Sequence, residues 1–204
     1  MKQLVILGAG GHGRVAADAA RCRGDFENIL FLDDSGEACV PGYRVAGRLS
    51  DFLAYRDNSA FLVAIGNAAL RRKLIRQLEE AGCTLATVIH PASVIGAHVR
   101  IGAGTVIMAG AVVNTGAVIG KGVILNTACS VDHDCRIDDF SHISVGAHLA
   151  GAVSVGSETL IGAGATVINL VRICGGCTIG AGAVVVRHIE TPGTYVGVPA
   201  KRRQ

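Results

Sequence analysis

The tripeptide Asp132-His133-Asp134 places one imidazole between two carboxylates, within a stretch that is otherwise rich in small side chains. An imidazole with a pKa near 6.5 exchanges protons around neutral pH, so it suits the role of a general base. A carboxylate bonded to its second ring nitrogen would fix the tautomer and raise the basicity. On an extended strand both acidic neighbours point away from His133, whereas a corner in the chain relaxes this. Which aspartate assists is open at this stage.

A second histidine, His142, follows His133 in the segment FSHISVG at 140–146. No serine, cysteine or lysine is placed as a convincing nucleophile, which favours direct transfer of a group over a covalent intermediate. Three further histidines, at positions 98, 148 and 188, are more simply interpreted as exposed residues without a chemical role.

These residues lie inside a six-residue repeat that runs from 94 to 189. The second position of every six is Ile, Val or Leu, from Ile95 to Val185, which makes 16 consecutive matches in 96 residues. Such a period predicts short strands that each bury one branched side chain and then turn, helped by glycine and other small residues. Three strands per turn give a triangular coil, so the repeat predicts about five stacked coils.

Residues 1–90 follow a different pattern, in which strand and helix signals alternate. We expect strands at 4–7, 29–32, 61–65 and 87–89, and helices at 15–22 and 68–81, the second of which ends at Gly82. This alternation predicts a small parallel sheet. We therefore expect two domains, a Rossmann-like α/β domain at 1–90 and a β-helix with a C-terminal tail at 91–204.

The glycines of Gly8-x-Gly10-x-x-Gly13 follow the first expected strand and open the first helix, as in the dinucleotide-binding fingerprint. Their backbone N–H groups can approach a pyrophosphate at the positive end of the helix. Asp33 and Asp34 close the second strand and offer acceptors for a ribose hydroxyl or a uracil N–H. Only half of an ordinary dinucleotide domain precedes the repeats. The plain alternative is a glycine turn that allows close helix–strand packing without a ligand.

The composition limits the classes of function. A net charge of +3 is too small and too scattered to indicate nucleic-acid binding, and no apolar run approaches the roughly 18 residues of a membrane span. The apolar run at 4–7 is interpreted as a strand rather than a signal peptide, and the seven cysteines are an odd number, so we expect a reduced, cytoplasmic protein. Cys174-Gly175-Gly176-Cys177 is a CxxC motif, but no second pair accompanies it to complete a zinc site.

The repeats resemble those of the hexapeptide-repeat acyltransferases, whose fold is a left-handed parallel β-helix. The segment GVPAK at 197–201 matches the GxPAK ending of the members that use coenzyme A. The segments GAGGHG, FLDD and AIGN, which begin at positions 8, 31 and 64, resemble a narrower group of PglD-type, NeuD-type and perosamine-type sugar acetyltransferases. The resemblance implies transfer of an acetyl group from acetyl-CoA to an amino sugar carried by a nucleotide. It also implies a homotrimer with active sites between subunits.

The resemblance implies roles for individual residues as well. His133 is the base, Asp134 its orienter, and His142 a contact to the acetyl end or to the sugar. PglD-type members carry glutamate at the position of Asp134, and the shorter aspartate leaves that orienting role open. The implied nucleotide-sugar site comprises Gly10, Gly11, His12, Gly13, Asp33, Asp34, Gly66 and Asn67. The implied acetyl-CoA site comprises His142, Gly151 (which also donates to the oxyanion), Ala163, Ala181, Pro199 and Lys201, with Arg202 and Arg203 near the coenzyme phosphates.

Several functions stay open. Ser141-His142 and the Asp33-Asp34 pair favour an amino sugar carried by a nucleotide over a sialic acid. The resemblance implies UDP-4-amino-4,6-dideoxy-N-acetylglucosamine as this acceptor, giving UDP-N,N'-diacetylbacillosamine. GDP-perosamine N-acetylation and sialic acid O-acetylation would use the same base. A metal-dependent hydratase of the γ-carbonic anhydrase kind needs two histidines five residues apart, a spacing that positions 98, 133, 142 and 148 lack, so no metal is expected. A structural β-helix with a nucleotide-sensing cap is the non-enzymatic alternative.

Overall fold

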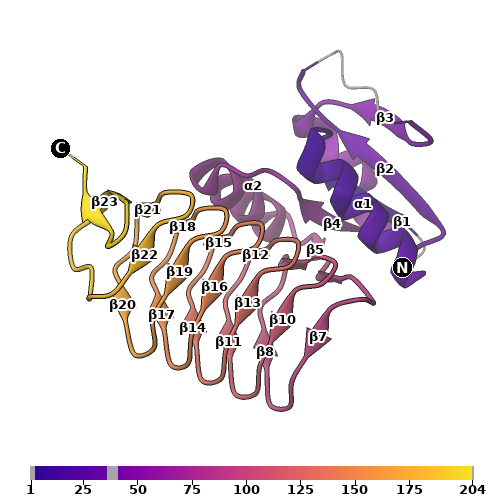
Figure 1. The fold of residues 1–204 in the computed structure, drawn as a ribbon. Helices are drawn as coiled ribbons and strands as arrows, with labels where there is room; N and C mark the ends of the chain where they lie inside the picture. The colour runs from indigo at the N-terminus through magenta and orange to yellow at the C-terminus, as the bar shows by residue number, and fades with distance from the viewer. Residues whose placement is uncertain (1–2, 36–40, 204) are drawn as a thin grey trace. The chain divides into compact units, whose positions relative to one another are not determined.

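The computed structural model describes residues 3–35 and 41–203 of the chain (Figure 1). It divides into two units, Met1–Pro91 and Ala92–Gln204, and each has its own buried aliphatic core.

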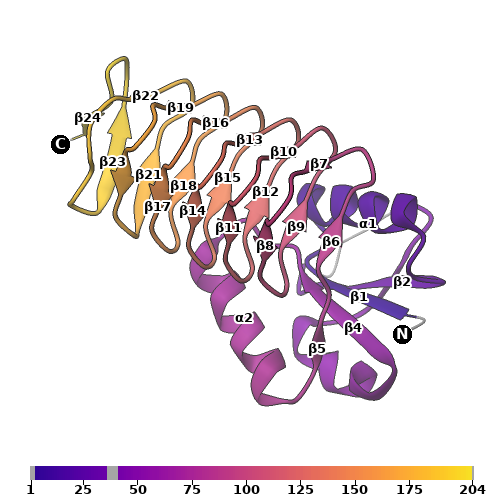
Figure 2. The ribbon, with the colours of Figure 1, turned by 90° about the horizontal axis from the view of Figure 1, so that it is seen from below.

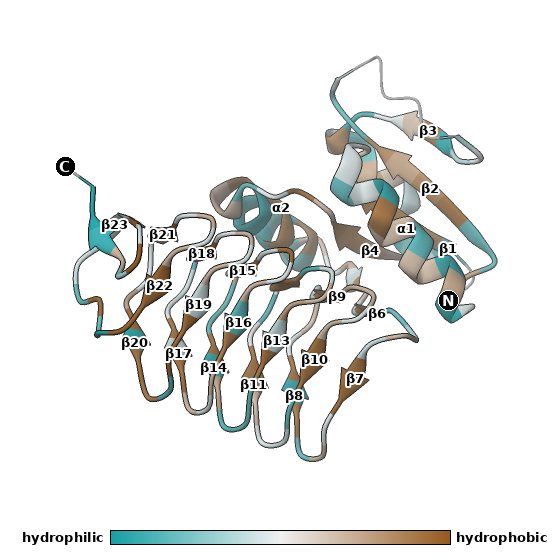
Figure 3. Cartoon of the chain, viewed as in Figure 1, coloured by the Kyte–Doolittle hydropathy of each residue, from teal (hydrophilic) through white to brown (hydrophobic). Residues whose placement is uncertain are grey.

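The first unit is built on a five-stranded parallel sheet with the strand order β3-β2-β1-β4-β5. Its strands are β1 (Gln3–Leu7), β2 (Asn28–Leu32), β3 (Arg44–Gly47), β4 (Ser59–Val63) and β5 (Thr84–Leu85). The other elements of the unit are α1 (Gly11–Arg23), the 3-10 helix η1 (Leu49–Asn58), α2 (Ala68–Glu80) and β6 (Val88–Ile89). The central strands β1 and β4 are almost wholly buried, as expected of a parallel sheet. Figure 3 shows β2 and β4 as mainly hydrophobic, while α1 and α2 carry mixed stripes.

The predicted elements of this unit are present, with shifted boundaries. Helix α1 begins four residues before the expected 15, inside the glycine motif, and β4 begins and ends two residues before the expected 61–65. Gly82 has a left-handed backbone (φ 73°) directly after α2, as its predicted role in ending that helix requires. The sequence did not predict β3, η1 or β5. Helix η1 buries no residue, so hydrophobic periodicity gives no signal there.

The second unit is a left-handed parallel β-helix in which each coil has 18 residues and one strand in each of three sheets (Figure 2). The β13 face contains β7 (Val94–Ile95), β10 (Val112–Val113), β13 (Ser130–Val131), β16 (His148–Leu149), β19 (Thr166–Val167) and β22 (Val184–Val185). The β14 face contains β8 (Arg100–Ile101), β11 (Val118–Ile119), β14 (Arg136–Ile137), β17 (Ser154–Val155) and β20 (Arg172–Ile173). The β15 face contains β9 (Val106–Ile107), β12 (Ile124–Leu125), β15 (His142–Ile143), β18 (Leu160–Ile161), β21 (Cys177–Ile179), β23 (Gly193–Val196) and β24 (Lys201–Arg202).

The six-residue repeat explains this coil. The second residue of each six is buried from Ile107 through Val185, which confirms the predicted aliphatic core. The fifth residue of each six, from 98 to 182, has a positive φ between 55° and 74°, and this left-handed conformation turns the chain at every corner. Glycine adopts it freely, whereas an L-residue such as Asp134 loses about 1 kcal/mol by doing so. The stacking of neighbouring coils imposes the conformation at both kinds of residue.

Buried side-chain hydroxyls join consecutive coils at the corner between the β14 and β15 faces. Thr105, Ser141 and Thr159 are buried in one column there. Ser141 Oγ donates to the carbonyl oxygen of Gly156 (2.9 Å) and accepts the N–H of Thr159 (3.3 Å). Cys177 occupies the next position of the column, where its N–H donates to Thr159 Oγ1 (3.3 Å). The column is a repeated structural device, and Cys177 is its only thiol among the described residues.

Candidate active site

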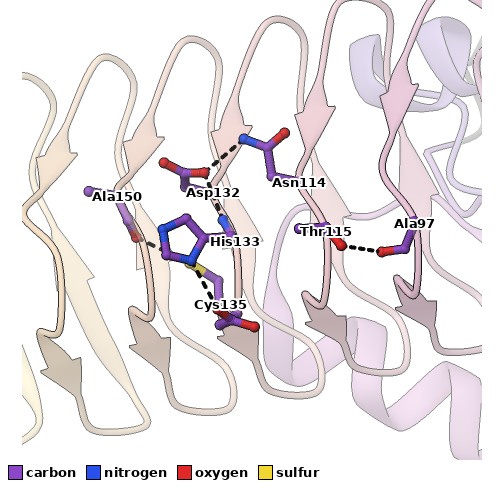
Figure 4. A network of polar contacts seen from close by, with 8 residues as sticks. Ala97, Asn114, Thr115, Asp132, His133, Cys135 and Ala150 are labelled. Atoms are coloured by element: carbon purple, nitrogen blue, oxygen red, sulfur yellow. Dashed lines mark hydrogen bonds and ion pairs between the residues drawn. The ribbon is translucent and has the colours of Figure 1, made fainter.

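The His133 imidazole lies at the corner between the β13 and β14 faces (Figure 4). Its Nδ1 is 2.9 Å from Asp134 Oδ2, so the neutral ring donates Nδ1–H to this carboxylate and keeps Nε2 as an acceptor. The pKa of His133 is raised, mainly by the hydrogen bond to Asp134 and less by the negative charges of Asp132 and Asp134. The imidazole is 55% exposed and accessible to a substrate. The pair therefore has the geometry of a general base and its orienting acid.

The left-handed backbone of Asp134 makes this contact possible. Its φ is 59°, and its N–H donates to the carbonyl oxygen of Thr115 in the preceding coil (3.1 Å). Strand β13 has already ended at Val131, so the alternation of side chains along a strand does not apply at 133–134. The aspartate reaches the ring although it is one methylene shorter than glutamate.

Asp132 has different partners. Its Oδ1 accepts from Asn114 Nδ2 (2.8 Å) and from the backbone N–H of His133 (2.7 Å), and these two bonds lower the pKa of Asp132. The ring contact thus belongs to Asp134, while Asp132 fixes the backbone of the base. Asn114 was not predicted from the sequence. It lies one 18-residue coil before Asp132, so aligning the repeat at intervals of 18 residues would reveal the pair.

Gly151 leaves the space that the His133 ring occupies. A Cβ atom at Gly151 would collide with Nε2 and would lie 2.7 Å from Cε1. Gly116 likewise leaves space for the carboxylate of Asp134, since a Cβ at Gly116 would lie 2.7 Å from Asp134 Oδ1. Glycines in the preceding and following coils therefore accommodate the pair.

The other predicted residues of the β-helix lie elsewhere on the coil. His142 is on the β15 face, where its Nε2 is 3.1 Å from Asn126 Nδ2. Ala163 and Ala181 are exposed, one coil apart, at the corner between the β15 and β13 faces. His133 and Gly151 share a different corner. Within one chain, the predicted residues thus form two separate groups, one with His133, Asp134 and Gly151 and the other with His142, Ala163 and Ala181.

Pro199 and Lys201 line a pocket of about 460 Å³ at the C-terminal end of the β-helix. Arg187, Tyr195 and Arg202 line it too, and three cationic side chains around one pocket suit phosphate groups. Arg187 and Tyr195 were not predicted, because no motif marks them.

A second pocket, of about 370 Å³, lies on the β13 face and is lined by Asp132 and Ala150, the residues that directly precede His133 and Gly151. Asn114, Ser130 and His148 also line it, and Ser130 Oγ is 2.8 Å from His148 Nδ1. His148, expected to have no chemical role, therefore lines a pocket next to the candidate base.

The described residues hold no group of three or more His, Cys, Asp or Glu side chains arranged to bind a metal ion. In the same ranges, no helix is long and apolar enough to cross a membrane.

In the first unit, the predicted nucleotide-binding residues meet at the carboxyl ends of the strands. The glycine loop follows β1, Asp33 follows β2, and Gly66 and Asn67 follow β4. The strand order reverses between β1 and β4, which is where parallel sheets bind ligands.

The glycines of the loop divide into two kinds. A Cβ at Gly13 would collide with the carbonyl oxygen of Gly8, so close packing alone explains this glycine. A Cβ at Gly10 would meet nothing within 4 Å, and at Gly11 only the end of Arg14 at 4.0 Å. Helix α1 has no acidic residue in its first turn, so its positive end can attract an anion. Gly10 and Gly11 thus leave open space in front of this helix end.

The acidic residues and Asn67 of this site are bonded to backbone groups. Asp33 accepts the N–H groups of Ala9 (2.6 Å) and Ser35 (2.8 Å). Burial favours a higher pKa for Asp33, but these bonds outweigh it and the pKa is lowered. Asp34 accepts from Leu49 N–H (2.9 Å) and borders a pocket of about 410 Å³. Asn67 caps α2 through Leu70 N–H (2.9 Å), so Asp33 and Asn67 shape the loops that carry them.

Arg71 is a buried cation that was not predicted from the sequence. It has no exposed surface, and its Nη1 donates to the carbonyl oxygens of Ile65 (2.7 Å) and Gly66 (3.0 Å). Burial, together with the charge of Arg71, lowers the pKa of His12 from 6.5 to about 4. His12 is therefore neutral at physiological pH, and Arg71 supplies the positive charge beneath the loop.

Residues 3–78 match the PglD N-terminal domain family. The whole chain is similar to the acetyltransferase domain of PglB from Neisseria gonorrhoeae FA1090, with 41% identity, 100% coverage of both chains and a TM-score of 0.96. The chain belongs to the PglD/NeuD family of hexapeptide-repeat sugar acetyltransferases.

Other members of the PglD/NeuD family carry ligands. The same N. gonorrhoeae domain in complex with acetyl coenzyme A is 41% identical over 99% of both chains, with a TM-score of 0.95. A histidine-to-asparagine variant of perosamine N-acetyltransferase from Caulobacter crescentus, in complex with CoA and GDP-perosamine, is 36% identical over 100% of this chain and 98% of that one, with a TM-score of 0.95. A curated relative from Bacillus subtilis, UDP-N-acetylbacillosamine N-acetyltransferase, is 36% identical over 101 residues, which span only 46% of its length and 47% of this chain.

Substituting Gly151→Ala should displace the His133 ring, because the added methyl group would collide with Nε2. We expect the pKa of His133 to fall toward its ordinary value as the contact with Asp134 is lost, measured by NMR titration of the imidazole. Gly146→Ala is the matched control, since a Cβ at Gly146 meets nothing within 4 Å and alanine already occupies equivalent corners at positions 128 and 152. An unchanged His133 titration in Gly151→Ala would contradict this role of the glycine.

His12 should make the first unit sensitive to acid. Its pKa is lower in the folded state (about 4) than in the unfolded chain (6.5), so only the unfolded chain binds the proton between these values. The free energy of unfolding should therefore fall by up to about 3 kcal/mol as the pH drops through this window. Denaturant unfolding at several pH values should show this loss in the wild type and in the exposed control His98→Asn, and a smaller one in His12→Asn. Equal losses in all three proteins would exclude His12 as the source.

Proposed function

We propose that this chain is an acetyl-CoA-dependent N-acetyltransferase that acts on an amino sugar carried by a nucleotide. The observation that carries the proposal is the His133–Asp134 pair, set over Gly151 at an exposed corner of the β-helix. Relatives of known structure that bind acetyl coenzyme A, or CoA with GDP-perosamine, support the two substrates. The open glycine loop at the positive end of α1 supports a nucleotide in the first unit.

In the proposed reaction, neutral His133 accepts a proton at Nε2 from the acceptor amine while the amine nitrogen attacks the thioester carbonyl carbon. The C–N bond forms, and the N–H of Gly151 stabilises the charge on the carbonyl oxygen. The C–S bond then breaks, the imidazolium returns its proton from Nε2 to the leaving sulfur, and coenzyme A leaves as the thiol with His133 neutral again. Asp134 accepts Nδ1–H throughout and so stabilises the imidazolium. In the pocket on the β13 face, the side chains of Asn114, Ser130 and His148 offer hydrogen bonds to sugar hydroxyls.

We assign the second group of predicted residues to a neighbouring subunit of a homotrimer. His142, Ala163 and Ala181 lie on parts of the coil that do not include the His133 corner. A cyclic trimer of parallel β-helices places a different surface of each neighbour against that corner. In this arrangement the coenzyme lies between two chains, with Lys201 and Arg202 near its phosphates.

We further propose UDP-4-amino-4,6-dideoxy-N-acetylglucosamine as the acceptor, giving UDP-N,N'-diacetylbacillosamine. The similarity to UDP-N-acetylbacillosamine N-acetyltransferase supports it. GDP-perosamine is the second candidate, because the similarity to perosamine N-acetyltransferase extends over the whole chain.

The experiment follows thiol release from acetyl-CoA with each of these acceptors. We expect release with wild type and a loss of about 10²- to 10⁴-fold in kcat for His133→Ala, as is typical when a general base is removed. Asp134→Asn should lose activity and, because Asp134 raises the pKa of His133, should shift the acid limb of kcat/KM to lower pH. His98→Asn, at an equivalent corner, should retain wild-type activity. Wild-type release that survives in His133→Ala would place the chemistry elsewhere, and no release with either acceptor would exclude both proposed substrates.

A further inference from the structure

The CxxC motif has no part in the proposed reaction, yet its two thiols lie side by side. Cys174 and Cys177 Sγ atoms are 3.5 Å apart, and both cysteines are reduced. They begin and end a tight turn between β20 and β21, with Gly176 at φ 70°. The ends of such a turn are less than about 7 Å apart at Cα, which overlaps the range that a disulfide spans.

One side chain holds both ends of this turn. Thr159 Oγ1 donates to the carbonyl oxygen of Cys174 (3.1 Å) and accepts the N–H of Cys177 (3.3 Å). The two backbones are therefore fixed, and rotation of the cysteine side chains is the movement that bond formation requires. The intervening Gly175 and Gly176 add no side chain that would resist it.

The two thiols differ in exposure. Cys177 is buried, whereas Cys174 is half-buried and lines a surface pocket of about 460 Å³ on the β14 face. Burial and the neighbouring Cys174 thiol raise the pKa of Cys177 to about 11, so its thiolate is scarce near neutral pH. An oxidant from solvent reaches Cys174 first, and Cys177 then acts as the resolving thiol.

We propose that Cys174 and Cys177 are a modification site, at which a small disulfide oxidant such as oxidised glutathione converts the two thiols into a reversible intramolecular disulfide. The Cys174 thiolate attacks one sulfur of the oxidant, forms a mixed disulfide and releases one reduced thiol. The Cys177 thiolate then attacks Cys174 Sγ and releases the second. The protein loses two electrons and two protons, which the oxidant gains as two thiols.

The disulfide changes the contacts of the C-terminal segment. In the reduced protein, Cys177 Sγ donates to the carbonyl oxygen of Thr191 (3.7 Å), which also accepts from the hydroxyl of Tyr195 (2.9 Å). Oxidation removes the thiol proton and redirects the sulfur, so Thr191 loses this donor. Strand β23 begins two residues later and pairs with β21 through Cys177 and Gly193. Amide exchange in β23 therefore reports on the redox state of the turn.

The test incubates the reduced full-length chain with oxidised glutathione at about pH 8, traps free thiols by alkylation and maps cysteines by peptide mass. We expect wild type to yield a 174–177 disulfide that dithiothreitol reverses, with faster amide exchange in β23. Cys177→Ser should instead accumulate a glutathione adduct on Cys174. This variant should fold, because hydroxyls already occupy its column at Thr105, Ser141 and Thr159.

Cys22→Ser is the matched control, because Cys22 is exposed and lies in the first unit. It should form the 174–177 disulfide at the wild-type rate. The proposal is overturned if Cys174 and Cys177 both remain alkylatable while Cys22 of wild type becomes glutathionylated. It is equally overturned if Cys174 pairs with another cysteine. The readout is the state of the thiols, so it does not depend on acetyl transfer.

Discussion

The β-helix depends on a left-handed backbone conformation at every sixth residue, which turns the chain so that each strand lies in register with the strand one coil before it. Glycine meets this constraint at little cost, and other residues meet it because the stacked coils leave them no alternative. At Asp134 the same constraint directs a carboxylate toward the neighbouring imidazole. The corner that shapes the fold thus also orients the candidate base and leaves its second nitrogen open to a substrate.

Close stacking of the coils determines the rest of the site. His133 reaches toward the next coil and Asp134 toward the preceding one, and each finds a glycine. Asp132, bonded to Asn114 one coil earlier, holds the backbone between them. In the first unit, the buried Arg71 holds the loop after β4 through the carbonyl oxygens of Ile65 and Gly66.

The sequence predicts the coils well, because the core requires one aliphatic side chain in every six residues. It does not decide whether Asp132 or Asp134 contacts the imidazole, because that contact depends on the positive φ of Asp134. Glu158 and Leu170 also have a positive φ but no assigned chemical role, so the conformation alone does not mark a site. The contacts of His133 with Gly151 and of Asp132 with Asn114 join residues one coil apart, so a local motif cannot reveal them. Arg71 was not predicted for a related reason. An arginine on a helix is expected to be exposed, and only the three-dimensional fold shows that this one is buried.

In the proposed trimer, His133 of one chain acts together with the surface around Ala163 of a neighbouring chain. The most direct test co-expresses two inactive, differently tagged variants, His133→Ala and Ala163→Asp, and assays the purified mixed assemblies for acetyl transfer. If each site uses His133 from one chain and Ala163 from the next, every mixed cyclic trimer has one intact site in three, so the purified mixed assemblies should show about a third of wild-type activity. Activity that stays at the level of the separate variants would contradict a site shared between subunits.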